Sequence, residues 1–171
     1  MKLYKKIIPR IAKDIIAELT LKNYIEIENG KMEEAELDIT AIIVEYVNNE
    51  KKIHEQAKQI IAKRGFEHNR FYQIKKNIAS SLGYKIESEA LDFILNQIIE
   101  GFFASRNIAE IFGKDNDIRK TAKIIIDKYL LIPEELDKEA RKYLKNINEG
   151  TAEWSIEYPR IISILKRRKN F

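Results

Sequence analysis

The 171-residue chain contains no cysteine, which excludes disulfide bonds, thiolate metal centres and cysteine nucleophiles. It has only six glycines and three prolines, and this scarcity of turn residues favours long helices over a turn-rich β fold. No stretch approaches the roughly 18 apolar residues of a membrane-spanning helix, and we expect no signal peptide. These absences predict an all-α cytoplasmic protein without a membrane partner.

What the chain does contain is enough apolar material for a core. Hydrophobic residues make up 44% of the sequence and charged residues 34%, and the formal net charge is only +4. A chain of this length buries about 70% of its unfolded surface, so that no metal is needed to hold the fold. We therefore expect a folded protein with a hydrophobic core that is not embedded in a membrane.

Apolar residues recur at helical spacing in four stretches of the first half of the chain. These stretches start at Ile8, Ile39, Ile53 and Phe71. The third stops at Gly65 and the fourth at Gly83, and glycine commonly follows a helix C-terminus. Residues 23–30 interrupt the pattern and are predicted to form a loop. The first half is therefore predicted to hold four helices.

The same four stripes return without a gap in the second half of the chain, when the numbering is shifted by 83. Their counterparts start at Leu91, Ala122, Leu136 and Trp154. Pro133 then suits the first turn of the helix that holds Leu136. Any amphipathic helical chain can be slid onto itself, but one shift that satisfies four stripes favours a true repeat. We predict two tandem four-helix units, residues 1–83 and 84–171, related by an internal duplication.

The C-terminal region carries a distinctive motif of a glycine turn, a tryptophan and a later tyrosine. Its candidate residues are Glu149, Gly150, Thr151, Glu153, Trp154 and Tyr158. This motif, together with residues 5–16 and 36–39, resembles the bacterial family known as domain of unknown function 507. The resemblance implies an α-helical bacterial cytoplasmic protein, and it implies no activity and no site residues.

The motif also has an account in local chemistry. Gly150 suits a helix end, Thr151 the cap of the next helix, and Glu153 the positive first turn. Trp154 aligns with the apolar Phe71 of the first unit, which predicts burial. We interpret the motif as a structural staple, and the alternative is a binding surface.

No residue set supports a catalytic, metal or cofactor site. His54 begins a zinc-helix pattern, but Lys58 stands where that pattern requires the second histidine. Asp115 begins a segment like a calcium loop, but Ile126 stands where the loop requires a glutamate. We therefore expect no catalytic residue, no metal and no cofactor, and an enzymatic role is the least expected one.

Basic residues gather near both ends of the chain. The candidate basic surface consists of Lys5, Lys6, Arg10, Arg160, Arg167 and Arg168. Such a surface could bind nucleic-acid phosphates, although the net charge is small for a dedicated nucleic-acid module. We expect a protein-interaction or assembly role, with an unknown protein or a second copy as partner, and keep nucleic-acid binding as the alternative.

The second unit carries extra apolar residues where the first is polar. Phe103 replaces Thr20, and Leu131 and Ile132 replace Asn48 and Asn49. Packing between the two units would bury them, and we favour this interpretation because it avoids the entropy cost of association. The alternative is a surface for a partner or a second copy.

Overall fold

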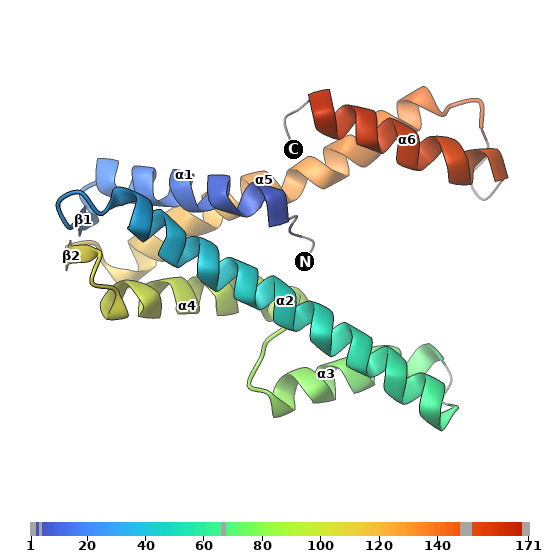
Figure 1. The fold of residues 1–171 in the computed structure, drawn as a ribbon, viewed down its shortest axis with the longest axis horizontal. Helices are drawn as coiled ribbons and strands as arrows, with labels where there is room; N and C mark the ends of the chain where they lie inside the picture. The colour runs from blue at the N-terminus through green and yellow to red at the C-terminus, as the bar shows by residue number, and fades with distance from the viewer. Residues whose placement is uncertain (1–2, 4, 66–67, 148–151, 169–171) are drawn as a thin grey trace. The chain divides into compact units, whose positions relative to one another are not determined.

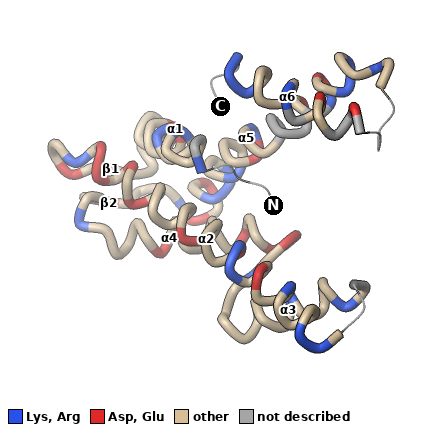
Figure 2. The backbone as a smooth tube through the Cα atoms, turned by 45° about the vertical axis from the view of Figure 1, so that its right-hand side comes forward, with Lys and Arg blue, Asp and Glu red and all other residues tan. Residues whose placement is uncertain are grey.

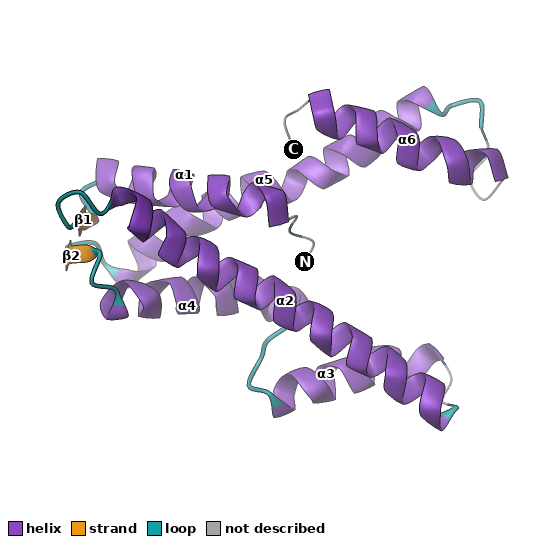
Figure 3. Ribbon diagram, viewed as in Figure 1, coloured by secondary structure: helices purple, strands orange, loops and turns teal. Residues whose placement is uncertain are grey.

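The computed structural model describes residue 3 and residues 5–65, 68–147 and 152–168. The chain is mainly α-helical, as the sequence predicts, with one small two-stranded sheet (Figures 1 and 3). The elements in chain order are η1 (Lys5–Ile7), α1 (Ile8–Leu21), β1 (Ile25–Ile27), α2 (Met32–Arg64), η2 (His68–Arg70), α3 (Phe71–Ser81), η3 (Glu87–Glu89), α4 (Ala90–Ala104), β2 (Ile108–Ile111), α5 (Asp115–Tyr143) and α6 (Ala152–Arg168).

Helix α1 follows directly from its sequence. Pro9 lies in the first turn, where a missing backbone N–H costs little. The predicted apolar stripe is buried at all of its positions, which are Ile8, Ile11, Ala12, Ile15, Ile16 and Leu19. The prediction of the first helix is confirmed.

The prediction of four helices in each unit is wrong. The second and third stretches of the first half lie on one continuous helix, α2, which runs for 33 residues. The polar residues 48–52 between the stretches include no glycine or proline, so nothing in them ends the helix. Helix α2 ends where Gly65 adopts a left-handed conformation with φ of 61°, as the sequence predicts.

The second half departs from the prediction in the same way. Helix α5 continues from Asp115 to Tyr143, so Pro133 lies inside a helix and does not begin one. The fourth apolar stripe of the first half predicts burial of Leu82, but this residue is 56% exposed because α3 already ends at Ser81.

Residues 23–30 are not simply a loop, because Ile25–Ile27 forms strand β1. It pairs antiparallel with β2, with Ile25 opposite Ile111, Glu26 opposite Glu110 and Ile27 opposite Ile108. Ala109 has no residue opposite it and forms an irregularity in the ladder. The sheet joins segments from both halves of the chain.

The chain divides into two compact units, residues 1–125 and 126–171. In the first unit α2 packs on α1, α3 and α4. A side chain at Gly101 of α4 would place its Cβ 2.7 Å from Ile42 Cδ1 of α2, which shows how closely these two helices approach. The second unit has its own cluster of Leu136, Ala140 and Leu165, where the last part of α5 packs against α6.

Helices and strands of the first half have counterparts in the second half about 83 residues later, close to the predicted shift. Strand β1 begins at Ile25 and β2 at Ile108, a shift of 83, and the same shift separates the start of α2 from the start of α5. Helices α4 and α6 begin within two residues of the positions that α1 and α3 predict. The duplication itself and the division after residue 83 stay predictions.

Candidate functional site

The C-terminal motif lies partly outside the described residues. Glu149, Gly150 and Thr151 lie outside the described residues, and so does the side chain of Trp154. Glu153 is exposed in the first turn of α6, which suits its charge. Tyr158 is half-buried against the cluster of the second unit. Its position fits a staple, and the choice between staple and binding surface stays a prediction.

The basic residues of the two chain ends belong to different compact units. Lys5 and Arg10 are exposed in the first unit, where Lys5 Nζ donates a hydrogen bond to Asn48 Oδ1. The side chain of Lys6 lies outside the described residues. Arg160, Arg167 and Arg168 are exposed on α6 of the second unit. A common basic surface of both ends therefore stays a prediction.

Neither a cluster of metal ligands nor a membrane-spanning helix is found among the described residues. Among them no three His, Asp or Glu side chains gather as metal ligands would. None of the helices in this part of the chain has the length and apolar content needed to cross a bilayer.

The most distinctive surface lies where α4 leads into β2. An open groove of about 540 Å³ is lined by Phe102, Phe103, Ser105 and residues 108–112, and we call it the α4–β2 groove. Phe103 is 74% exposed and Phe112 is 59% exposed, so both rings border the groove and meet solvent. Within the first unit Phe103 is therefore not buried, and packing between the two predicted repeats stays a prediction. The side chains of Leu131 and Ile132 are outside the described residues.

Local geometry explains why these two rings face outward. Successive residues of a helix are turned by about 100°, so Phe102 enters the core at 4% exposure while Phe103 points away from it. Along β2, side chains alternate between the two faces of the sheet. Ile111 lies opposite the buried Ile25, whereas Glu110 and Phe112 are exposed.

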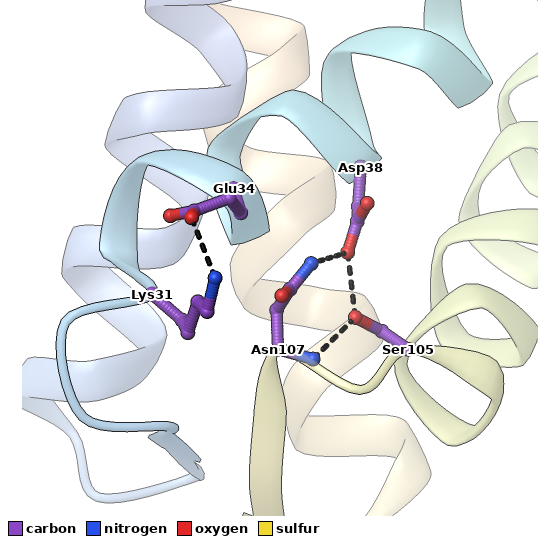
Figure 4. A network of polar contacts seen from close by, with 5 residues as sticks. All are labelled: Lys31, Glu34, Asp38, Ser105 and Asn107. Atoms are coloured by element: carbon purple, nitrogen blue, oxygen red, sulfur yellow. Dashed lines mark hydrogen bonds and ion pairs between the residues drawn. The ribbon is translucent and has the colours of Figure 1, made fainter.

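A polar network holds the turn between α4 and β2 (Figure 4). Asp38 Oδ2 of α2 accepts hydrogen bonds from Ser105 Oγ at 2.5 Å and from Asn107 Nδ2 at 2.8 Å. Ser105 Oγ in turn accepts one from the backbone N–H of Asn107 at 3.0 Å. Because all three side chains are partly buried, these bonds fix one side of the groove to α2.

The matching turn between α1 and β1 has a different character. The positions equivalent to the two exposed rings are Thr20, at the end of α1, and Asn29, just after β1. Lys22 Nζ lies 3.4 Å from Thr121 Oγ1 of α5. With the shift of 83, these two residues are the equivalents of Ser105 and Asp38. The first turn is thus polar where the second is aromatic.

The charges near the sheet are unbalanced. Glu26 and Glu110 stand directly opposite each other on the two strands, and both are exposed. Within the described residues no ion pair joins either of them to a cation. Acidic positions on the strands are marked in Figure 2. Like charges in this position are destabilising.

Another charge pair marks the start of α2. Lys31 Nζ and Glu34 Oε1 are 2.8 Å apart (Figure 4). This hydrogen bond lowers the pKa of the Glu34 carboxyl below its usual 4.5 and raises the pKa of Lys31 above 10.5. Both side chains are about half exposed, so their role is a local one at the helix start.

Sequence reasoning identified Phe103 but missed the groove around it. The signal for the strands was present, because Ile25–Ile27 and Ile108–Ile111 alternate or nearly alternate apolar and polar residues. Each stretch is short, and nothing in the sequence says that the two pair with each other. The groove depends on that pairing.

The comparison with known families agrees with the resemblance in the sequence. The family model described as "Protein of unknown function (DUF507)" matches residues 1–171, the whole chain. The chain therefore belongs to this family. A search of curated proteins finds no match to the chain.

Proposed function

We propose that this protein is a non-enzymatic protein-interaction or assembly module, with the α4–β2 groove as its docking surface. The observation that carries the proposal is that two exposed rings, Phe103 and Phe112, line one open groove. A cytoplasmic location in a bacterium is part of the same proposal and is supported by the composition and the family resemblance.

Exposed aromatic rings beside a groove favour binding for an energetic reason. Aromatic side chains bury a large area on association, and they are enriched among the residues that dominate binding energy. Single exposed apolar residues are ordinary on any surface, but two rings at one groove form a local apolar patch. The Asp38 network supports this geometry by holding the turn in one conformation before a partner arrives.

Nucleic-acid binding is the second candidate and is favoured by a feature of α6. Its last turn carries Lys166, Arg167 and Arg168, and Arg167 and Arg168 are exposed. Arg160 is partly neutralised by Glu157 at 3.2 Å. Affinity that falls steeply with salt and depends on Arg167 and Arg168 would support this candidate.

Site-specific photo-crosslinking in cells tests the docking surface. A photoreactive phenylalanine analogue at position 103 is expected to form adducts with a protein partner. The same analogue at Leu21 is the matched control, because Leu21 is 76% exposed on α1 and does not line the groove. Phe112→Asn should remove the adducts at position 103 without lowering the melting temperature.

The identified partner must then bind the purified full-length chain, and Phe103→Thr must weaken that binding. A second copy of the chain counts as a partner in this experiment. Equal adducts at positions 21 and 103, or none at either position, would overturn the docking surface.

A further inference from the structure

We infer that the hairpin formed by the second half of α2 and by α3 is a binding surface for single-stranded nucleic acid. This hairpin comprises residues 50–85, and we call it the basic hairpin. None of its described residues lines the α4–β2 groove, so the inference adds a second surface to the proposed function. Three observations carry it: a segregation of charge, cations without a carboxylate partner, and an exposed ring.

The first observation is the distribution of charge along the chain. Residues 50–85 hold nine of the 31 Lys and Arg residues but only three of the 27 Asp and Glu residues. The basic hairpin therefore has a formal charge of +6, and the rest of the chain together has −2. With the shift of 83, the equivalent residues 133–168 hold eight basic and seven acidic residues, a formal charge of +1. The small net charge of the whole chain thus conceals one strongly basic segment.

The second observation is that most of these cations have no carboxylate beside them. Glu50 pairs with Lys75, and Glu55 pairs with Lys58, each with 3.4 Å between Oε1 and Nζ. Five further cations are exposed and form no ion pair among the described residues; they are Lys51, Lys52, Lys63, Arg64 and Lys76. Exposed cations without counter-charges attract the phosphates of a nucleic acid, and each contact releases a condensed counterion.

One exposed stripe of α2 arranges such groups in a row. It consists of Lys52, Gln56, Gln59 and Lys63. Their spacing of four, three and four residues places them on one side of the helix, and the stripe extends for about 16 Å. The glutamine amides between the two lysines can donate hydrogen bonds to phosphate oxygens. The stripe therefore offers phosphates a row of donors without an acidic residue.

The hairpin is firmly built before any ligand binds. The ion pair between Glu50 of α2 and Lys75 of α3 is nearly buried. A core cluster of Ile53, Ala79 and Ile86 also joins the two helices. A surface that is already ordered loses little conformational entropy on binding. Lys and Arg positions along the hairpin are blue in Figure 2.

The third observation is an exposed ring on α3. Tyr72 is 69% exposed, and Lys76 follows one turn later on the same side of the helix. The Phe71 ring contacts both Tyr72 and His54 of α2, with ring centroids 5.8 Å and 5.0 Å apart. An exposed ring beside cations suits the stacking of an unpaired base, whereas a duplex keeps its bases stacked inside. The ring therefore favours a single strand as the ligand.

Fluorescence anisotropy of the purified full-length chain tests the phosphate contacts. The probes are labelled oligouridylate, oligothymidylate and a DNA duplex of equal length. Lys52→Gln/Lys63→Gln should weaken single-strand binding at least about tenfold and reduce the slope of log affinity against log salt by about 1.4, because two phosphate contacts are lost. Lys142→Gln/Lys145→Gln is the matched control, since it removes the same charge from two exposed positions outside the basic hairpin.

Substitution of the ring tests stacking separately from charge. Tyr72→Ala should weaken single-strand binding at least about fivefold without changing the salt slope, and Tyr72→Trp should retain the binding. Tyr143→Ala is the control, because Tyr143 is 60% exposed outside the hairpin. All the replaced side chains are exposed, so each variant should keep the melting temperature of the wild type.

The outcomes separate the inference from its alternatives. Binding of either single strand with these losses supports it, and the tighter strand identifies the sugar that the surface takes. A chain that binds neither single strand at about 50 mM salt would overturn it. An equal loss in the control variants, or duplex binding as tight as single-strand binding, would also overturn it. Binding that depends on Arg167 and Arg168 but not on Lys52 and Lys63 would place the nucleic acid on α6 instead.

Discussion

The turns α1–β1 and α4–β2 occupy equivalent places in the two halves of the chain and differ in chemistry. Both end a helix whose apolar stripe is largely buried, and both lead into a strand of the same sheet. Thr20 of α1 and Asn29 after β1 flank the first turn and its strand, whereas the exposed Phe103 of α4 and Phe112 after β2 flank the second. Both helices bury apolar residues close to these places, so the difference lies at exposed positions.

The helical hairpins that follow show a second contrast. Helices α2 and α3 are joined by the nearly buried pair Lys75–Glu50, with Nζ and Oε1 3.4 Å apart. The equivalent positions in α6 and α5 are Tyr158 and Pro133, which cannot form an ion pair. One hairpin thus uses a buried charge pair where the other has an aromatic ring, and the two should respond differently to substitution.

The largest expected effect is on this ion pair. Glu50→Ala leaves the ammonium of Lys75 with no counter-charge at about 10% side-chain exposure. We expect a loss of about 3 kcal/mol in the free energy of unfolding, measured by urea denaturation. The apolar double variant Glu50→Leu/Lys75→Leu should recover most of it. A single variant as stable as the wild type would show that the pair is dispensable.

A smaller effect is expected at the two turns. Asp38→Ala removes the acceptor of both Ser105 and Asn107, and should cost about 1–3 kcal/mol in thermal or chemical unfolding. Thr121→Ala removes only the long contact from Lys22, so it should cost less than about 1 kcal/mol. The reverse order would contradict the view that the second turn is the more firmly held.

The smallest effect concerns pH at the start of α2. The lowered pKa of Glu34 means that the folded chain binds this proton less readily than the unfolded chain. The stabilisation is therefore present above pH 4.5 and is lost as the pH falls through the folded-state pKa. The melting-temperature difference between wild type and Lys31→Ala should shrink on acidification. A difference that grows below pH 4.5 would contradict this assignment.

The sequence pattern correctly predicted the parts of the fold that depend on residues close together in the chain. The buried stripe of α1 and the left-handed Gly65 follow from residues close together in the chain. The continuity of α2 was missed because a break in an apolar stripe is not a break in a helix. Residues 48–52 are polar but contain no helix breaker.

Features built from distant residues could not be foreseen in the same way. Leu82 and Leu165 occupy equivalent positions, but Leu82 is 56% exposed and Leu165 is 2% exposed. Gly83 follows a helix that has just ended, whereas α6 continues through the equivalent Lys166. The groove likewise needs the pairing of β1 with β2, so the sequence pointed to Phe103 and not to the surface around it.

The most direct test of the difference between the two turns gives the second turn the polar residues of the first. Binding of the partner captured at position 103 is compared among Phe103→Thr/Phe112→Asn, the wild type and Leu21→Thr, which removes an equally exposed apolar residue outside the groove. We predict that the double variant keeps its melting temperature and loses this binding, while Leu21→Thr binds as the wild type does. A double variant that still binds as the wild type does, or that loses its stability, would contradict the account.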